Sequence, residues 1–233
     1  MSIKKIIDIS KYQDPKNIDY DLLTKNIDGV ILRIGYTGYG TGSSLNKDEH
    51  FETHYKEFKK RNIPIGAYYY SCADTEKDGI NEAIFVYDII KNKEFDLPIY
   101  LDVEDEHHQK NQSKNILTKA VDTFLSYLEN KGYYVGLYAS SSWLNFRLDM
   151  NVLSKYTIWV AHYGVSKPSF NGKYDMWQYT SSGRLPGYNY DLDLNYLYKD
   201  FSIIKKSGMN GYKKQEEKKY TIDEIIKHMK EIN

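Results

Sequence analysis

Two carboxylates with a spacing suited to acid–base chemistry, Asp102 and Glu104, follow the apolar run from Pro98 to Leu101. Side chains two positions apart on a strand point the same way, with Cα atoms about 6.5 Å apart. Two carboxylates this close cannot both ionise freely, so the pKa of one should rise. The pair would then offer a proton donor beside an anion near neutral pH, as glycoside hydrolysis requires. Asp105 has the opposite parity and is left out of the pair.

The strands that must hold these carboxylates recur along the chain between turn-forming residues. We expect eight, at residues 4–9, 29–36, 64–71, 98–104, 133–140, 156–163, 174–180 and 191–198. Helix-like segments at 47–61, 76–92, 113–131 and 141–154 lie between them. Segment 113–131 has its apolar residues on one helical face, with Ser113 as its expected N-cap and Gly132 just past its end.

Alternating strands and helices favour a parallel sheet, and eight strands in 233 residues favour a closed barrel. The last three strands are joined by links too short for full helices, and a parallel crossover needs at least about 10–12 residues. We therefore predict an α/β fold, an irregular TIM-like barrel of about five βα units followed by three strands with short connections. The final strands should be antiparallel or irregular.

In a βα barrel the chemistry lies at the carboxyl ends of the strands. Besides the central pair, Asp8 falls there on the first strand, and Asp191 and Asp193 fall there on the last. Polar and aromatic side chains at the same ends are candidates for substrate binding: Arg33, Tyr36, Tyr68, Tyr70, Tyr138, Trp159, Tyr163, Trp177 and Gln178. The arginine could bind a substrate carboxylate or form a salt bridge to an aspartate. The rings could stack on sugars or pack in the core.

Eight stretches of the chain, in order, resemble the lysozymes of glycoside hydrolase family 25, the muramidases found as phage endolysins and bacterial autolysins. They are IIDIS (6–10), GVILRIGYTG (29–38), PIGAYYYS (64–71), PIYLDVED (98–105), GYYVGLYAS (132–140), IWVAHYG (158–164), MWQYTSSGRLPGYN (176–189) and DLDLN (191–195). The resemblance covers about residues 4–200. It implies cleavage of the β-1,4 bonds between N-acetylmuramic acid and N-acetylglucosamine in bacterial peptidoglycan, with no cofactor and no metal ion.

The resemblance also implies a role for each carboxylate. Glu104 corresponds to the general acid/base of the family. Asp102 corresponds to the residue that assists, either as a nucleophile or by orienting the substrate's own 2-acetamido group. The family's first-strand aspartate falls on Asp8. Its late aspartate falls on Asp193, because Asn195 follows at the right offset, with Asp191 as the second choice.

The chain changes in composition after residue 203. Residues 204–219 are polar and rich in lysine and glycine, as a linker would be. In residues 220–233, Thr221 and Glu224 form a capping-box pattern ahead of a stripe of isoleucines. We expect a catalytic barrel over 1–203, a polar linker over 204–219 and an amphipathic helix over 220–233. That helix could dock on the barrel, mediate a homo-oligomer or lead into a wall-binding module.

Composition speaks against two classes of partner. The 32 basic residues are balanced by 32 acidic ones, so nucleic-acid binding through a basic surface is not expected. No run of about 18 apolar residues exists, so membrane insertion is not expected either.

The N-terminal stretch MSIKKIIDIS lacks the apolar core of a signal peptide. We therefore expect synthesis in the cytoplasm and release to the cell wall by a phage holin-type route.

Two other functions compete with this interpretation. The stretch EDEHH at 104–108 and the pair His50/His54 contain metal-binding residue types, as a metal-dependent polysaccharide deacetylase would need. However, no glutamate follows the first histidine of the pair in the metalloprotease manner. The other competitor is a non-catalytic cell-wall sugar-binding protein, which would be expected to have lost Glu104 or Asp102. The single cysteine, Cys72, excludes an intrachain disulfide.

Overall fold

One β-sheet organises this computed structural model, which describes residues 3–38 and 44–214. Its strands in these residues are β1 (Lys4–Ile9), β2 (Gly29–Thr37), β3 (Leu45–Lys47), β4 (Ile65–Ser71), β5 (Ile99–Val103), β6 (Val135–Ser140), β7 (Thr157–Ala161), β8 (Met176–Leu185) and β9 (Tyr188–Leu197). Their order is β1-β9-β8-β7-β6-β5-β4-β2-β3, and β1 also pairs with β2. Eight strands therefore close into the predicted barrel, and the short β3, which was not predicted, lies beside β2.

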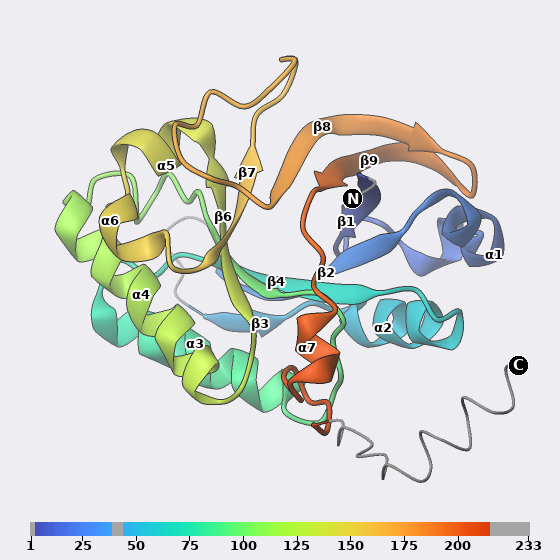
Figure 1. The fold of residues 1–233 in the computed structure, drawn as a ribbon, viewed down its shortest axis with the longest axis horizontal. Helices are drawn as coiled ribbons and strands as arrows, with labels where there is room; N and C mark the ends of the chain where they lie inside the picture. Colours follow the sequence, from blue (N-terminus) through green and yellow to red (C-terminus); the bar gives the residue numbers. More distant parts are fainter. Residues whose placement is uncertain (1–2, 39–43, 215–233) are drawn as a thin grey trace, which may run out of the picture.

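The helices lie outside the strands (Figure 1). The longer ones are α2 (Phe51–Lys60), α3 (Glu76–Ile90) and α4 (Lys114–Asn130). The short ones are η1 (Pro15–Asn17), α1 (Tyr20–Leu23), η2 (Thr24–Asn26), α5 (Ser141–Phe146), α6 (Met150–Leu153) and α7 (Ile203–Lys206). Helix α4 begins and ends as predicted, because the Ser113 hydroxyl caps the Ile116 amide at 3.3 Å and Gly132 adopts a φ of +86°.

We expected the last strands to be antiparallel or irregular, and β9 is antiparallel whereas β8 is parallel to the strand before it. Strand β9 is antiparallel to both β8 and β1, whereas β8 runs parallel to β7. Residues 162–175 connect β7 to β8 without a helix. They are still long enough to return the chain to the end of the barrel at which β7 begins, so that β8 can run parallel to β7. Beyond the barrel, the β8–β9 hairpin reaches toward α1, where Ile18 bridges to Tyr188 (Figure 1).

Strand alternation separates two apolar clusters and places the polar residues. Outward-facing residues such as Leu101 and Val103 pack with the helices in the larger cluster. Inward-facing residues fill the barrel with Ile6, Ile31, Tyr100, Trp159, Met176 and Leu197. Gly136 makes room there, since a Cβ would lie 2.5 Å from the Tyr100 ring. On several of these strands, the next inward-facing residue toward the carboxyl end is polar, as with Asp8 after Ile6 and Asp102 after Tyr100. This change from apolar to polar side chains marks the mouth of the barrel.

The segment after β9 packs against the opposite end of the barrel. The side chain of Asn210 is fully buried, accepts from the Tyr134 amide at 2.7 Å and donates to the Leu97 carbonyl at 2.9 Å. Residues 204–214, predicted as the first part of a linker, are thus held to the barrel. The rest of that linker and the helix predicted over 220–233, with its possible role in homo-oligomers, lie outside the described residues. Within the described residues, no helix is long and apolar enough to span a membrane.

Candidate active site

A cavity of about 160 Å³ lies at the carboxyl ends of the barrel strands. It is lined by Asp8, Tyr68, Asp102, Glu104, Tyr138, Trp159, Tyr163, Gln178 and Asp193. The four carboxylates predicted to be catalytic therefore meet in one place. The second choice on β9, Asp191, instead lies exposed on the hairpin, where it pairs with Arg184 at 2.9 Å.

Asp8 is held by two amides from neighbouring strands. Its Oδ2 accepts from Gln178 Nε2 at 2.9 Å and from Asn195 Nδ2 at 2.8 Å. Asn195 is oriented in turn by Trp159, whose indole N–H donates to Asn195 Oδ1 at 2.8 Å. These bonds fix which way both amides point, so Asp8 faces its neighbours as an acceptor. Asn195 was not predicted as a site residue, although it shares the inward parity of Asp193 on the same strand.

Two tyrosines extend this network to the rim of the cavity. The hydroxyls of Tyr138 and Tyr163 donate to Gln178 Oε1 at 2.8 and 2.5 Å. The Tyr138 ring packs edge-on against Trp159 with centroids 4.5 Å apart, and Trp159 is 1% exposed. The indole therefore forms the floor beneath the carboxylates, while the tyrosines stand at the wall.

Asp102 is buried and has an unused acceptor. Its Oδ1 has no hydrogen-bond partner among the described residues. Burial raises the pKa of Asp102 well above its usual range, the charges of Glu104 and Asp8 raise it further, and Arg33 opposes them. A buried acceptor beside an open cavity is costly unless a ligand group binds it. Asp102 Oδ1 is therefore available to accept a hydrogen bond from a group that enters the cavity.

Glu104 has the properties of a proton donor. Burial among the surrounding groups, followed by the charge of Asp193, raises the pKa of Glu104 to about 7. The side chain is itself exposed at the mouth, so solvent screens part of this effect without changing its direction. The rise agrees with the prediction from sequence, but its cause differs. We expected repulsion by Asp102, whereas that repulsion raises the pKa of Asp102 instead.

Four of the nine predicted substrate-binding residues do not line the cavity. Trp177 points outward because it has the opposite parity to Gln178, and its indole N–H donates to the His162 carbonyl at 2.8 Å. Arg33 is buried in a salt bridge to Asp48 at 2.7 Å, an aspartate outside the mouth.

The two remaining residues of that group are tyrosines held by other partners. The Tyr36 ring lies 5.1 Å from the Arg33 guanidinium carbon, in a cation–π arrangement. The Tyr70 hydroxyl donates to Asp105 Oδ2 at 3.1 Å. Both tyrosines are therefore already engaged by other protein groups.

A second cavity, of about 420 Å³, adjoins the first on its Glu104 side. The two share Glu104, Tyr138 and Tyr163 as lining residues. The remaining lining comes from the ends of β6 and β7, from α5 and from the 162–175 segment: Ser140, Ser141, Ser142, Asn145, Phe146, Ala161, His162 and Ser169. Phe146 is 74% exposed, and the buried hydroxyl of Ser141 has no partner among the described residues. The sequence did not reveal this cavity, because only the fold brings α5 and 162–175 together.

The competing deacetylase interpretation proposed four histidines as metal ligands: His50, His54, His107 and His108. None of them lines either cavity at the mouth of the barrel. His54 is buried and its Nδ1 is hydrogen-bonded to the Tyr20 hydroxyl at 2.7 Å. Burial lowers the pKa of His54 to about 4. His50 lies at the N-terminal end of α2.

A mostly parallel barrel with several carboxylates at its mouth has the groups that glycoside hydrolysis requires. The family model described as "Glycosyl hydrolases family 25" matches residues 7–188. The chain therefore belongs to glycoside hydrolase family 25, as its sequence stretches indicated.

Individual relatives agree with this assignment. An autolytic lysozyme of Clostridium acetobutylicum is 30% identical over 148 residues, which are 64% of this chain and 44% of that protein. The match thus spans less than half the length of that relative. GHIP, a glycosyl hydrolase 25 of Streptococcus pneumoniae, has a TM-score of 0.74 and 27% identity over 88% of this chain and 92% of its own. The catalytic domain of the ply40 endolysin, from a bacteriophage of Listeria monocytogenes, has a TM-score of 0.71 and 28% identity over 87% and 96%.

Proposed function

We propose that the chain is a lysozyme that hydrolyses the β-1,4 bonds between N-acetylmuramic acid and N-acetylglucosamine in bacterial peptidoglycan, and so acts on the cell wall. The observation that carries this proposal is the convergence of Glu104, Asp102, Asp8 and Asp193 on one cavity. The similarity to an autolytic lysozyme and to an endolysin supports the choice of substrate. We place the catalytic unit in residues 1–203, together with the packed segment 204–214. Loss of turbidity of purified Gram-positive cell walls tests the activity.

In this mechanism Glu104 acts first as an acid. A carboxyl group whose pKa is raised to about 7 holds its proton near neutral pH. It donates that proton to the glycosidic oxygen as the bond to the anomeric carbon breaks. The resulting carboxylate then takes a proton from water, which attacks the sugar in the second step.

Asp102 stabilises the positive charge that develops at the anomeric carbon. Two routes use its buried Oδ1. In one, this oxygen attacks the anomeric carbon and forms a covalent intermediate. In the other, it accepts from the N–H of the 2-acetamido group and aims the acetamido carbonyl at the same carbon. Asp8 and Asp193 lie beside it, and the charge of Asp193 helps to keep the proton on Glu104.

Five of the predicted substrate-binding residues line the cavity, and we propose them as contacts for the sugar: Tyr68, Tyr138, Trp159, Tyr163 and Gln178. Arg33 acts from behind, because its positive charge lowers the pKa of Asp102 and favours the anion. Tyr36, Tyr70 and Trp177 support the strands in this account rather than bind substrate.

The second cavity suits the sugar that leaves. A general acid must lie beside the glycosidic oxygen, where the site of the attacked sugar meets the site of the leaving sugar. Glu104 lines both cavities, so the one beyond it receives the N-acetylglucosamine end of the cleaved bond. Its serine and asparagine side chains offer hydrogen bonds to hydroxyl and acetamido groups, and the exposed Phe146 ring offers a stacking face.

Phe146→Ala should lower kcat/KM on peptidoglycan by roughly 3- to 10-fold, because it removes one stacking contact to the leaving sugar. The same variant should cleave an aryl glycoside with a small leaving group at the wild-type rate, since that group does not reach Phe146. Val152→Ala is the matched control, because it shortens an exposed apolar side chain on the next helix, α6, which does not line the cavity. An equal loss on both substrates would contradict the assignment of this cavity.

Activity should fall as the pH rises through about 7, where Glu104 loses its proton. A profile of kcat/KM on soluble glycan from about pH 5 to about pH 9 should decline about tenfold per unit on its alkaline side. Asp193→Asn should move that decline to lower pH, because the charge of Asp193 raises the pKa of Glu104. Activity that increases through pH 7 to a plateau would require a deprotonated base instead and would contradict the assigned role.

Wall hydrolysis should persist after dialysis against EDTA, because the proposed steps use only carboxyl groups and water. The measurement is the initial rate of turbidity loss before and after chelation, with and without added Zn²⁺. Loss of the activity on chelation and its return with metal would favour the deacetylase interpretation instead.

A further inference from the structure

We propose that Cys72, Asp105 and His108 form a binding site for a thiophilic divalent cation of the Zn²⁺ type, outside the catalytic cavity. One ligand atom from each residue lies within 4.8 Å of the other two. Among the described residues, no other group of three or more His, Cys, Asp or Glu side chains is arranged in this way. None of the three residues lines the catalytic cavity.

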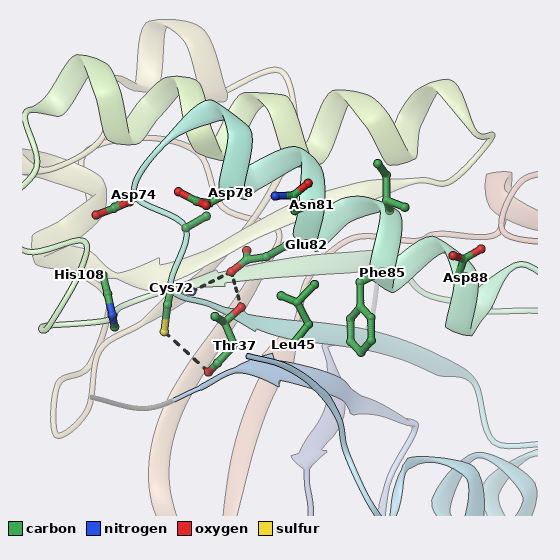
Figure 2. A pocket seen from close by; sticks show the side chains of 12 residues that line it. Thr37, Leu45, Cys72, Asp74, Asp78, Asn81, Glu82, Phe85, Asp88 and His108 are labelled. Carbon is green, nitrogen blue, oxygen red and sulfur yellow. Dashed lines mark hydrogen bonds between the residues drawn. The ribbon is translucent and has the colours of Figure 1, made fainter. Parts of the chain in front are cut away.

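The barrel topology brings the three residues together. Cys72 directly follows β4, and Asp105 and His108 lie in the segment after β5. Strands β4 and β5 are parallel neighbours with Ser71 opposite Val103, so the two segments leave the sheet side by side. Figure 2 shows Cys72 and His108 at the same end of a cavity of about 540 Å³, which gives an ion and its water a way in. The side chain of His108 is 22% exposed, whereas Asp105 is buried.

The donor set suits Zn²⁺ better than Mg²⁺ or Ca²⁺. A thiolate, an imidazole and one carboxylate are ligands for zinc, whereas the harder cations prefer oxygen alone. Zinc binds such atoms at about 2.0–2.3 Å in a tetrahedral arrangement, so any two of its ligands lie about 3.3–3.8 Å apart. A small movement of the Cys72 or His108 side chain therefore completes a three-ligand site. Water from the cavity can take the fourth position.

The existing bonds of Asp105 would support the metal rather than compete with it. Its Oδ1 accepts from the backbone amides of His107 and His108 at 3.1 and 2.6 Å, and its Oδ2 accepts from the Tyr70 hydroxyl at 3.1 Å. Outer hydrogen bonds of this kind hold metal-ligating carboxylates in position. The bond that joins His108 Nδ1 to Asp105 Oδ1 at 2.9 Å must break, and the cation takes the place of its proton. The Cys72 thiol must also give up its weak hydrogen bonds to the Thr37 and Gly38 carbonyls, at 3.8 and 3.5 Å.

Charge and protons balance in this binding step. The Cys72 thiol releases its proton to water, and the neutral His108 ring moves its proton to Nε2. The thiolate and the Asp105 carboxylate then neutralise the two positive charges of the ion. Burial raises the pKa of the Cys72 thiol above its ordinary range, and the cation must displace the thiol proton in order to bind. Binding should therefore weaken as the pH falls.

Co²⁺ reports directly on such a site, because a thiolate bound to it gives a charge-transfer absorption and a four-coordinate site gives intense visible bands. We would titrate the full chain, stripped of metals, with Co²⁺ and then displace the Co²⁺ with Zn²⁺. The expected result is one equivalent of Co²⁺ with both spectral features, and a higher melting temperature with either ion. Cys72→Ser should abolish the charge-transfer band.

His108→Ala should weaken Zn²⁺ binding, measured by competition with a chromophoric chelator, by about 100-fold or more. His107→Ala is the matched control, since His107 is the adjacent histidine and supplies only its backbone amide to Asp105. Circular dichroism of each variant without metal verifies the fold. The proposal is overturned if wild type gives no thiolate band, if the band survives Cys72→Ser, or if His107→Ala weakens binding as much as His108→Ala.

Discussion

Glu104→Gln should lower kcat for cell-wall hydrolysis by about 1,000-fold, the size of effect expected when a general acid is removed. Glutamine keeps the shape of the side chain and its place between the two cavities, but it has no carboxyl proton to donate. KM should change little, because binding of the glycan depends on the other lining residues. The rate of turbidity loss and the release of reducing ends, measured over a range of wall concentrations, separate the two constants.

Glu106→Gln is the matched control for this change. Glu106 lies two positions further along, exposed to solvent, where it pairs with Lys110 at 2.9 Å. The exposed pair contributes little to stability, so this variant should fold and act like wild type. Circular dichroism and thermal unfolding of both variants verify that the fold is intact. The role of Glu104 is untenable if its glutamine variant lyses walls as fast as wild type.

Asp102→Asn should lower kcat by about 100-fold or more, because the negative charge beside the anomeric carbon is lost. The free energy of unfolding near pH 8 should stay equal or rise. The pKa of Asp102 is raised in the folded protein, so its ionisation disfavours folding as the pH rises, and asparagine removes that cost. A loss of activity without a loss of stability therefore distinguishes a chemical role from a structural one. Chemical denaturation and steady-state kinetics on the same sample provide both values.

A thiazoline ligand, which mimics the intermediate of acetamido-assisted hydrolysis, separates the two routes open to Asp102. If Asp102 orients the acetamido group, the ligand should bind wild type tightly and Asp102→Asn weakly. If Asp102 is the nucleophile, a covalent sugar adduct on Asp102 should be detectable by mass spectrometry.

The matched control for the Asp102 variant is Asp191→Asn on the exposed hairpin, which should keep full activity. An Asp191→Asn defect as large as that of Asp102→Asn would contradict the choice of Asp193 as the late aspartate.

The position of Asp102 and Glu104 at the cavity could be predicted because two local rules suffice for it. Strand parity places Asp102 and Glu104 on one side, and the carboxyl ends of parallel strands meet at one mouth. The same rules indicated Asp8. Asp193 lies on β9, which runs antiparallel to both of its neighbours, and it was chosen over Asp191 through the resemblance to the family. Parity also argues against Trp177, since adjacent residues of one strand cannot both face the cavity. The prediction that Trp177 binds substrate therefore ignored the alternation of side chains along the strand.

Features that depend on distant contacts could not be predicted in this way. The salt bridge of Arg33 to Asp48 joins a strand to the turn before α2. The amide network around Asp8 requires β1, β8 and β9 to pair in a particular register. The cause of the raised pKa of Glu104 lies partly in Asp193, which is far away in sequence. The parallel direction of β8 depends on the path of 162–175, whose length alone permits either direction.

Identification of the newly formed chain ends tests the central claim most directly. Purified peptidoglycan is digested with the protein, the new reducing ends are converted to sugar alcohols with borohydride, and the hydrolysed products are separated. A muramidase gives muramicitol, in an amount that rises with digestion time and is absent with Glu104→Gln. Glucosaminitol in its place, or release of acetate without new reducing ends, would contradict the assignment of this site to the bond between N-acetylmuramic acid and N-acetylglucosamine.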